Sequence, residues 1–190
     1  FLFFCCTLSS CGSSWTAHPT TYESYKHCDP MLDDPVQLMF IPGYENSAIV
    51  VEDCDTFRRE KVAIAFQAFE IGWFSHIGDD KAVFENLRDI VVTFSREKRV
   101  RPGYMTDGSF TEHGIIGGMT TSKGSVWVFA HPGSLRICET SLIHELVHAS
   151  LWKLNGHGDP DHTGGLFEGW EERHYVLIDQ VNRHLCSIGI

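Results

Sequence analysis

Hydrophobic residues recur at helical spacing in three long segments of the chain. Residues 55–74 have a heavily apolar face and predict a core helix. Residues 140–155 show the same spacing and end at an Asn-Gly pair, which is a typical C-terminal stop. Residues 166–186 predict a last helix, and residues 79–87 predict a shorter helical piece.

Strand patterns occupy the intervals between these helices. Residues 48–51 and 90–94 are short runs rich in β-branched side chains. Residues 114–120 and 125–130 flank a Thr-Ser-Lys-Gly segment whose composition is typical of a hairpin turn. Residues 96–112 are polar and turn-rich, and we interpret them as a connection. The order of elements predicts an α+β domain with a core helix, a short mixed sheet that includes a hairpin, and further helices.

Composition narrows the class of protein. A length of 190 residues is enough for one domain with a sizeable core. The 15 basic and 25 acidic residues give a formal net charge of −10. Because neutralising the phosphates of a nucleic acid needs clustered Lys and Arg, we expect no nucleic acid partner.

The beginning of the chain resembles an export signal. Its first eight residues are mostly apolar, and no charged side chain precedes Glu23. The Leu-Ser-Ser-Cys-Gly sequence that follows resembles a bacterial lipobox, which implies cleavage before Cys11 and a diacylglycerol on its thiol. The alternative is a buried N-terminal segment. We expect a protein on the periplasmic or cell-surface side of a bacterial membrane, anchored by this lipid. The expected division is a truncated signal peptide with its lipobox (1–11), a polar tether (12–35) and the domain (36–190).

Cysteine usage agrees with export. Once the leader is removed and Cys11 carries lipid, four cysteines remain, which suits two disulfides in an oxidising compartment. Three pairings are possible. We favour Cys28 with Cys54, and Cys138 with Cys186, because the second would tie the last helix to the start of the helix before it. Four thiolates around a structural zinc ion are a weaker alternative, since the chain has no Cys-x-x-Cys pair.

The helix predicted over residues 140–155 carries the clearest chemical signal, the sequence His-Glu-Leu-Val-His at positions 144–148. Residues i and i+4 lie on one face of a helix, so the two imidazoles can bind one metal ion. Glu145 projects at a neighbouring angle, where its carboxylate can take a proton from a metal-bound water. We predict that His144 and His148 bind Zn²⁺ and that Glu145 is the catalytic base.

A catalytic zinc ion generally has three protein ligands, so a third is expected further along the chain. The helix carries the chain about 10 Å past His148, which leaves His157 too far along to fold back. Six more residues can return on the order of 20 Å, so that Asp161 or His162 can reach the metal. Asp159 and Glu168 are further alternatives.

The segment HELVHASLWKLNGHGDPDH is similar to the zinc-site segment of SprT-like (Spartan-type) metalloproteases. This resemblance covers only about residues 140–162. It implies His144, His148 and His162 as ligands, with Glu145 as general base. The acidic composition, the expected export and the cysteine usage of this chain differ from those of a DNA-linked protease. The resemblance therefore does not carry over the substrate class. The thermolysin-like gluzincins are a rival family, whose third ligand is a Glu at the distance where Glu168 stands. We prefer His162 because imidazole suits zinc and the return loop is a natural geometry.

The sequence therefore predicts an exported, lipid-anchored zinc endopeptidase with a small zincin-like domain. Its partner is a peptide or protein substrate, which can pair with an edge strand beside the cleft. The alternatives are a zinc-binding surface lipoprotein and a catalytically inactive zincin scaffold. Hydrolysis of cell-wall peptides would use the same metal chemistry.

Overall fold

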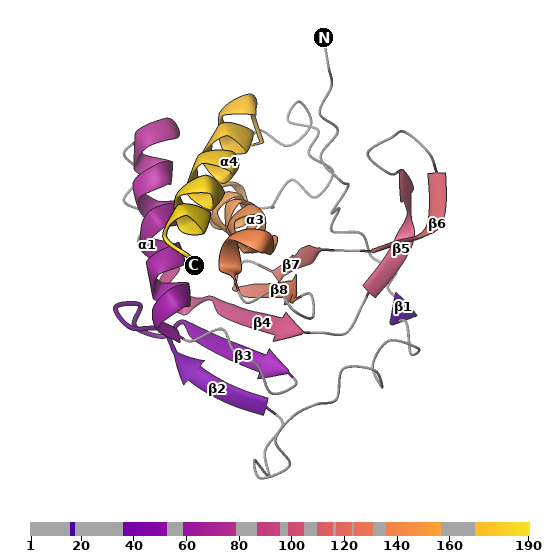
Figure 1. The fold of residues 1–190 in the computed structure, drawn as a ribbon, viewed down its shortest axis with the longest axis horizontal. Helices are drawn as coiled ribbons and strands as arrows, with labels where there is room; N and C mark the ends of the chain where they lie inside the picture. The colour runs from indigo at the N-terminus through magenta and orange to yellow at the C-terminus, as the bar shows by residue number, and fades with distance from the viewer. Residues whose placement is uncertain are drawn as a thin grey trace.

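The computed structural model describes residues 16–17, 36–52, 59–78, 87–95, 99–104, 110–115, 117–122, 124–130, 136–156 and 170–190. These residues form an α+β fold (Figure 1). Its elements in chain order are β1 (Thr16–Ala17), β2 (Val36–Phe40), β3 (Ala48–Glu52), α1 (Arg59–His76), η3 (Leu87–Asp89), β4 (Val91–Ser95), β5 (Arg99–Tyr104), β6 (Phe110–Ile115), β7 (Gly118–Ser122), β8 (Ser125–Phe129), η4 (Ile137–Glu139), α3 (Leu142–Asn155) and α4 (Glu172–Ser187).

The main sheet has the strand order β2-β3-β4-β8-β7. Strands β3, β4 and β8 are parallel to one another, while β2 and β7 are antiparallel to their neighbours at the two ends. The central strands bury Ile49, Val92, Phe94, Val126 and Val128 in the core. The predicted hairpin is confirmed as β7 and β8, and among the described residues β7 is the edge strand on its side of this sheet.

Helices α1, α3 and α4 form a layer on one side of the main sheet (Figure 1). Helix α3 contacts β7 and β8, and α1 packs against α4. A Cβ atom at Gly72 would lie 2.6 Å from Val181 Cγ2, so the glycine lets these two helices approach closely. The predicted disulfide between Cys138 and Cys186 is confirmed, and it ties the end of α4 to η4, just before α3.

Strands β5 and β6 correct the interpretation of residues 96–112 as a polar connection. They pair antiparallel, and the two-residue strand β1 joins β5 to complete a second sheet. Their pairing has an irregular register between Arg101 and Gly103, on either side of Pro102. Proline cannot donate to a strand ladder, and a bulge shifts side chains between faces, so the alternation that reveals a strand is lost here.

The helix predictions are confirmed for α1 and α3, with small changes at their ends. The last helix starts later than predicted: Trp170 and Glu171 are not helical, and α4 begins at Glu172. The backbone N–H of Glu171 donates to His174 Nδ1 at 2.8 Å, which satisfies a donor at the helix start. The predicted helix starts too early because apolar spacing by itself does not mark the residue at which a helix begins.

Several predictions fall on residues outside the described ranges. These are the signal peptide with its lipobox, the Cys28–Cys54 pair and most of the helix expected at residues 79–87. Of the expected tether, Thr16 and Ala17 are described, and they form β1. None of the described helices is sufficiently long and apolar to cross a lipid bilayer.

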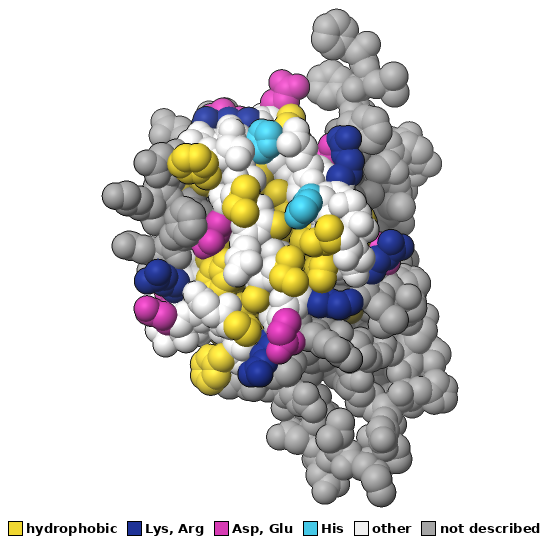
Figure 2. All heavy atoms as spheres, turned by 60° about the vertical axis from the view of Figure 1, so that its left-hand side comes forward, with side chains coloured by type: hydrophobic (Ala, Val, Ile, Leu, Met, Phe, Trp, Pro, Cys, Tyr) yellow, Lys and Arg dark blue, Asp and Glu magenta, His cyan; other side chains and the backbone are white. Residues whose placement is uncertain are grey.

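The surface on the α1 side of the molecule is mixed in character. Helix α1 exposes three large hydrophobic side chains, with relative exposures of 37% for Ile64, 68% for Ile71 and 57% for Phe74. Figure 2 shows that hydrophobic side chains on this face are separated by polar atoms and that charged side chains surround them.

Candidate metal centre on helix α3

Helix α3 is buried on all sides through residues 142–150. Its apolar residues pack against the main sheet and against the other two helices, which explains why the segment is hydrophobic around most of its circumference. The helix ends at Gly156, whose φ of 83° is left-handed and whose N–H bonds to the Trp152 carbonyl at 2.9 Å. The polar side chains of this helix are therefore enclosed, and burying them is costly unless they have partners.

His144 and His148 converge on each other. Their Nε2 atoms are 3.1 Å apart, and the relative exposure is 9% for His144 and zero for His148. Two nitrogen ligands at about 2.0–2.1 Å from a tetrahedral zinc ion lie about 3.3 Å apart. The donor atoms and their spacing therefore fit two ligands of one zinc ion.

Trp170 packs against both imidazoles. Its ring centroid lies 5.1 Å from that of His144 and 4.5 Å from that of His148. Trp170 is itself buried and also contacts the rings of His174 and Tyr175 at the start of α4. This aromatic cluster leaves little room for the two imidazoles to rotate, so the pair is held in place by packing from α4.

Glu145 faces a different neighbour, the edge strand β7. The Thr120 hydroxyl lies 3.0 Å from Glu145 Oε2 and 2.9 Å from the backbone carbonyl of the same residue. A Cβ atom at Gly118 would lie 2.7 Å from both Cγ and Oε1 of Glu145, so only glycine accommodates this carboxylate. Among the described residues, Glu145 Oε1 is buried and has no hydrogen-bond partner.

The environment of Glu145 favours its protonated form. Burial raises the pKa of the carboxyl from 4.5 to about 8, and the hydrogen bond from Thr120 lowers it by a smaller amount. The Thr120 hydroxyl can donate to Glu145 Oε2 or to the Glu145 backbone carbonyl, because its single proton serves one acceptor at a time. The residue is thus able to hold or release a proton near neutral pH.

The third-ligand candidates His162, Asp161, Asp159 and Glu168 lie outside the described residues. Among the residues that are described, no group of three or more His, Cys, Asp or Glu side chains is placed to hold a metal ion. The structure thus places His144, Glu145 and His148 on one buried stretch of α3, with the two imidazoles in contact.

Three contributors to the site were not singled out from the sequence: Gly118, Thr120 and Trp170. Gly118 and Thr120 belong to the predicted hairpin, but their contacts with Glu145 depend on how α3 crosses β7. Trp170 lies within the segment predicted as the last helix, but its contacts with His144 and His148 depend on how α4 packs against α3. One feature of the sequence could have predicted these contacts: the hairpin and the helix follow each other in the chain, and such neighbours usually pack together.

No protein-family model, curated protein or solved structure matches the chain. The chemistry of the site therefore has to be inferred from its own residues.

Proposed function

We propose that the protein is a zinc-dependent endopeptidase. The proposal rests mainly on one arrangement: two buried imidazoles whose Nε2 atoms are 3.1 Å apart, beside a buried carboxylate that contacts an edge strand. Burying three ionisable side chains on one helix costs free energy. A metal site with a catalytic base would give all three side chains a role.

The residues have separate roles in this proposal. His144 and His148 hold the zinc ion, and His162 is the proposed third ligand, with Glu168, Asp161 and Asp159 as alternatives. When bound, zinc would polarise a carbonyl and lower the pKa of its water ligand. Trp170 keeps the two imidazoles oriented and limits the access of bulk water to them.

Glu145 acts as the general base and then as the general acid. Its carboxylate accepts a proton from the attacking water and delivers it to the leaving amine. Glu145 Oε1 has no hydrogen-bond partner among the described residues, which leaves this oxygen available for the proton. Thr120 holds Oε2, and the absence of a side chain at Gly118 leaves space for the carboxylate to lie against β7.

An extended peptide is the substrate class that suits the surroundings. Strand β7 ends the described part of the main sheet, and Gly118 and Thr120 on this strand contact the base. A peptide that added itself to β7 would place its backbone along the edge next to Glu145. This is why we favour peptide hydrolysis over a small-molecule substrate.

The zincin-like character of the domain, its export and its lipid anchor at Cys11 are parts of the same proposal. The order of hairpin, proposed metal-binding helix and last helix supports the zincin-like character. The Cys138–Cys186 disulfide supports export, because disulfides persist in oxidising compartments.

The decisive experiment measures zinc and peptide cleavage together. We expect about one zinc per chain and cleavage of a mixed peptide library that a chelator abolishes and added zinc restores. His148→Asn should lose the metal and the activity, while the control His184→Asn, at an exposed position on α4, should keep both. Stoichiometric zinc without cleavage would support the zinc-binding lipoprotein, and no zinc at all would refute both functions.

A further inference from the structure

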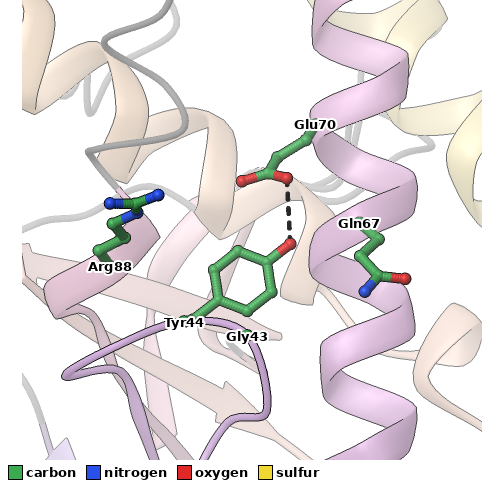
Figure 3. A pocket seen from close by; sticks show the side chains of 5 residues that line it. All are labelled: Gly43, Tyr44, Gln67, Glu70 and Arg88. Atoms are coloured by element: carbon green, nitrogen blue, oxygen red, sulfur yellow. Dashed lines mark hydrogen bonds between the residues drawn. The ribbon is translucent and has the colours of Figure 1, made fainter.

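A second polar pocket lies away from the metal centre. It is formed where the connection between β2 and β3 meets α1 and η3, and it has a volume of about 170 Å³ (Figure 3). Its lining consists of Gly43, Tyr44, Gln67, Glu70 and Arg88. The space equals roughly five to six water molecules, so a ligand would have about that number of non-hydrogen atoms.

The walls of this pocket are held in place by several contacts. Tyr44 is 5% exposed and packs edge to face on Phe66, with ring centroids 5.0 Å apart. The N–H of Asn46 bonds to the Arg88 carbonyl at 2.8 Å, which joins the β2–β3 connection to η3. The turn itself uses Gly43 at a φ of 84°. Packing and hydrogen bonds therefore fix the walls of this pocket.

Glu70 supplies a buried negative charge at the inner wall. It is 8% exposed, and the Tyr44 hydroxyl donates to its Oε2 at 3.1 Å. The other carboxylate oxygen points toward the side of the pocket where Arg88 lies (Figure 3). Burial raises the pKa of Glu70, which reflects the cost of a charge without a cation in direct contact. A cationic group in the pocket would offset this cost.

Arg88 supplies the positive charge at the outer rim. Its side chain is 50% exposed and pairs with the more exposed Glu45 at 3.6 Å. Among the described residues, no ion pair within 4.0 Å joins Arg88 to Glu70, although the two charges influence each other. Exposed pairs such as Arg88 with Glu45 are weak, so a ligand carboxylate could replace Glu45.

We propose that this pocket binds a small free α-amino acid in its zwitterionic form, with the ammonium group on Glu70 and the carboxylate on Arg88. An amino acid carries both an ammonium group and a carboxylate, which match the opposite charges of Glu70 and Arg88. The volume admits glycine or alanine. The Gln67 amide lies on the same wall as Glu70 and can add a polar contact.

The pocket does not depend on the zinc site. Helix α3 begins next to β7, where the Ser141 side chain lies close to Gly118. It ends near η3, where Lys153 forms an ion pair with Asp89. None of the residues that line the pocket belongs to the proposed zinc site. The proposal therefore stands whether or not the protein hydrolyses peptides.

Calorimetric titration of the full chain with glycine and L-alanine tests the proposal. We expect saturable binding of both, and at least tenfold weaker binding of methylammonium and acetate, which each carry half of the recognised charge. Protein treated with a chelator should bind alanine as well as untreated protein does.

Variants locate the binding. Glu70→Gln keeps an oxygen for the Tyr44 hydroxyl and should fold normally, which circular dichroism can verify, yet bind alanine at least tenfold more weakly. Arg88→Gln should lose a similar factor. The matched control Glu45→Gln removes only the rim partner and should bind alanine equally well or more tightly. The proposal is overturned if nothing binds up to about 50 mM. It is also overturned if folded Glu70→Gln binds normally, or if methylammonium or acetate binds as tightly as alanine.

Discussion

Glu145 and Glu70 are both buried helical carboxylates, and each lies within hydrogen-bond distance of a hydroxyl from another element. Glu145 is fully buried beside Thr120 of an edge strand, whereas Glu70 is 8% exposed beside Tyr44 and opposite Arg88. Burial raises the pKa of both. The difference lies in the neighbours: Glu145 lies against strand β7 on the helix that carries the two imidazoles, whereas a cation across an open pocket faces Glu70. The same side chain therefore suits proton transfer at one site and ligand binding at the other.

The largest expected effect separates the two carboxylates by their chemistry. Glu145→Gln should retain zinc but lower peptide hydrolysis by about 10²–10⁴-fold, because the amide cannot accept the proton. The same variant should bind alanine normally, and Glu70→Gln should keep its zinc while it loses alanine. Zinc analysis, peptide cleavage and alanine titration check these results in parallel. Normal hydrolysis by Glu145→Gln would remove Glu145 from the mechanism.

Stability as a function of pH should show the next largest difference, measured on chelator-treated protein. A carboxyl whose pKa is raised on folding stabilises the fold below its unfolded pKa, and this contribution is lost as the pH rises through the folded pKa. For Glu145 the window runs from 4.5 to about 8. The loss amounts to at most roughly 5 kcal/mol, from 1.36 kcal/mol per pH unit.

Glu145→Gln should therefore flatten the fall in unfolding free energy between about pH 5 and 8, as measured by urea denaturation. Glu70→Gln should flatten it in the same direction but less, because Tyr44 and Arg88 both lower the pKa of Glu70. An unchanged slope in the Glu145 variant would show that this carboxyl stays ionised in the folded protein.

The contact between Glu145 and β7 can be tested with a pair of adjacent glycines. Gly118→Ala would place a Cβ atom against Ser141 Oγ and 2.7 Å from Cγ and Oε1 of Glu145, and it should cost about 1–3 kcal/mol of stability. Gly117→Ala is the matched control, since its Cβ would meet only Ser141, at 3.5 Å and beyond. Thermal unfolding of both variants measures the difference. Equal losses would mean that Glu145 does not rest on Gly118.

The smallest expected effect concerns the hydroxyl at each carboxylate. Thr120→Val should keep zinc and reduce hydrolysis about tenfold, which corresponds to about 1.4 kcal/mol, through a less well-oriented base. Thr120→Ser should restore most of the activity because it keeps the hydroxyl. Peptide cleavage at saturating substrate separates this orientation effect from weaker substrate binding. Full activity of Thr120→Val would show that Thr120 does not orient the base.

Much of the architecture could be predicted from local patterns in the chain. Apolar spacing predicted α1 and α3, the β-branched runs predicted β3 and β4, and turn chemistry predicted the β7–β8 hairpin. The same patterns failed for β5 and β6, where Pro102 and a bulge hide the strand alternation. Local signals work where burial is one-sided and regular, and they fail where backbone pairing alone defines the strand.

The sequence by itself determined that His144 and His148 share a helix face, that the helix stops at Gly156, and that Cys138 and Cys186 are suited to pair. These properties follow from helical periodicity, from glycine at a left-handed position, and from the order of the last two helices. Only the tertiary structure decided that Glu145 rests against Gly118 and Thr120, that Trp170 covers the two imidazoles, and that Tyr44 meets Glu70. These contacts join segments far apart in the chain, and their geometry depends on how helices and sheet pack rather than on any local pattern.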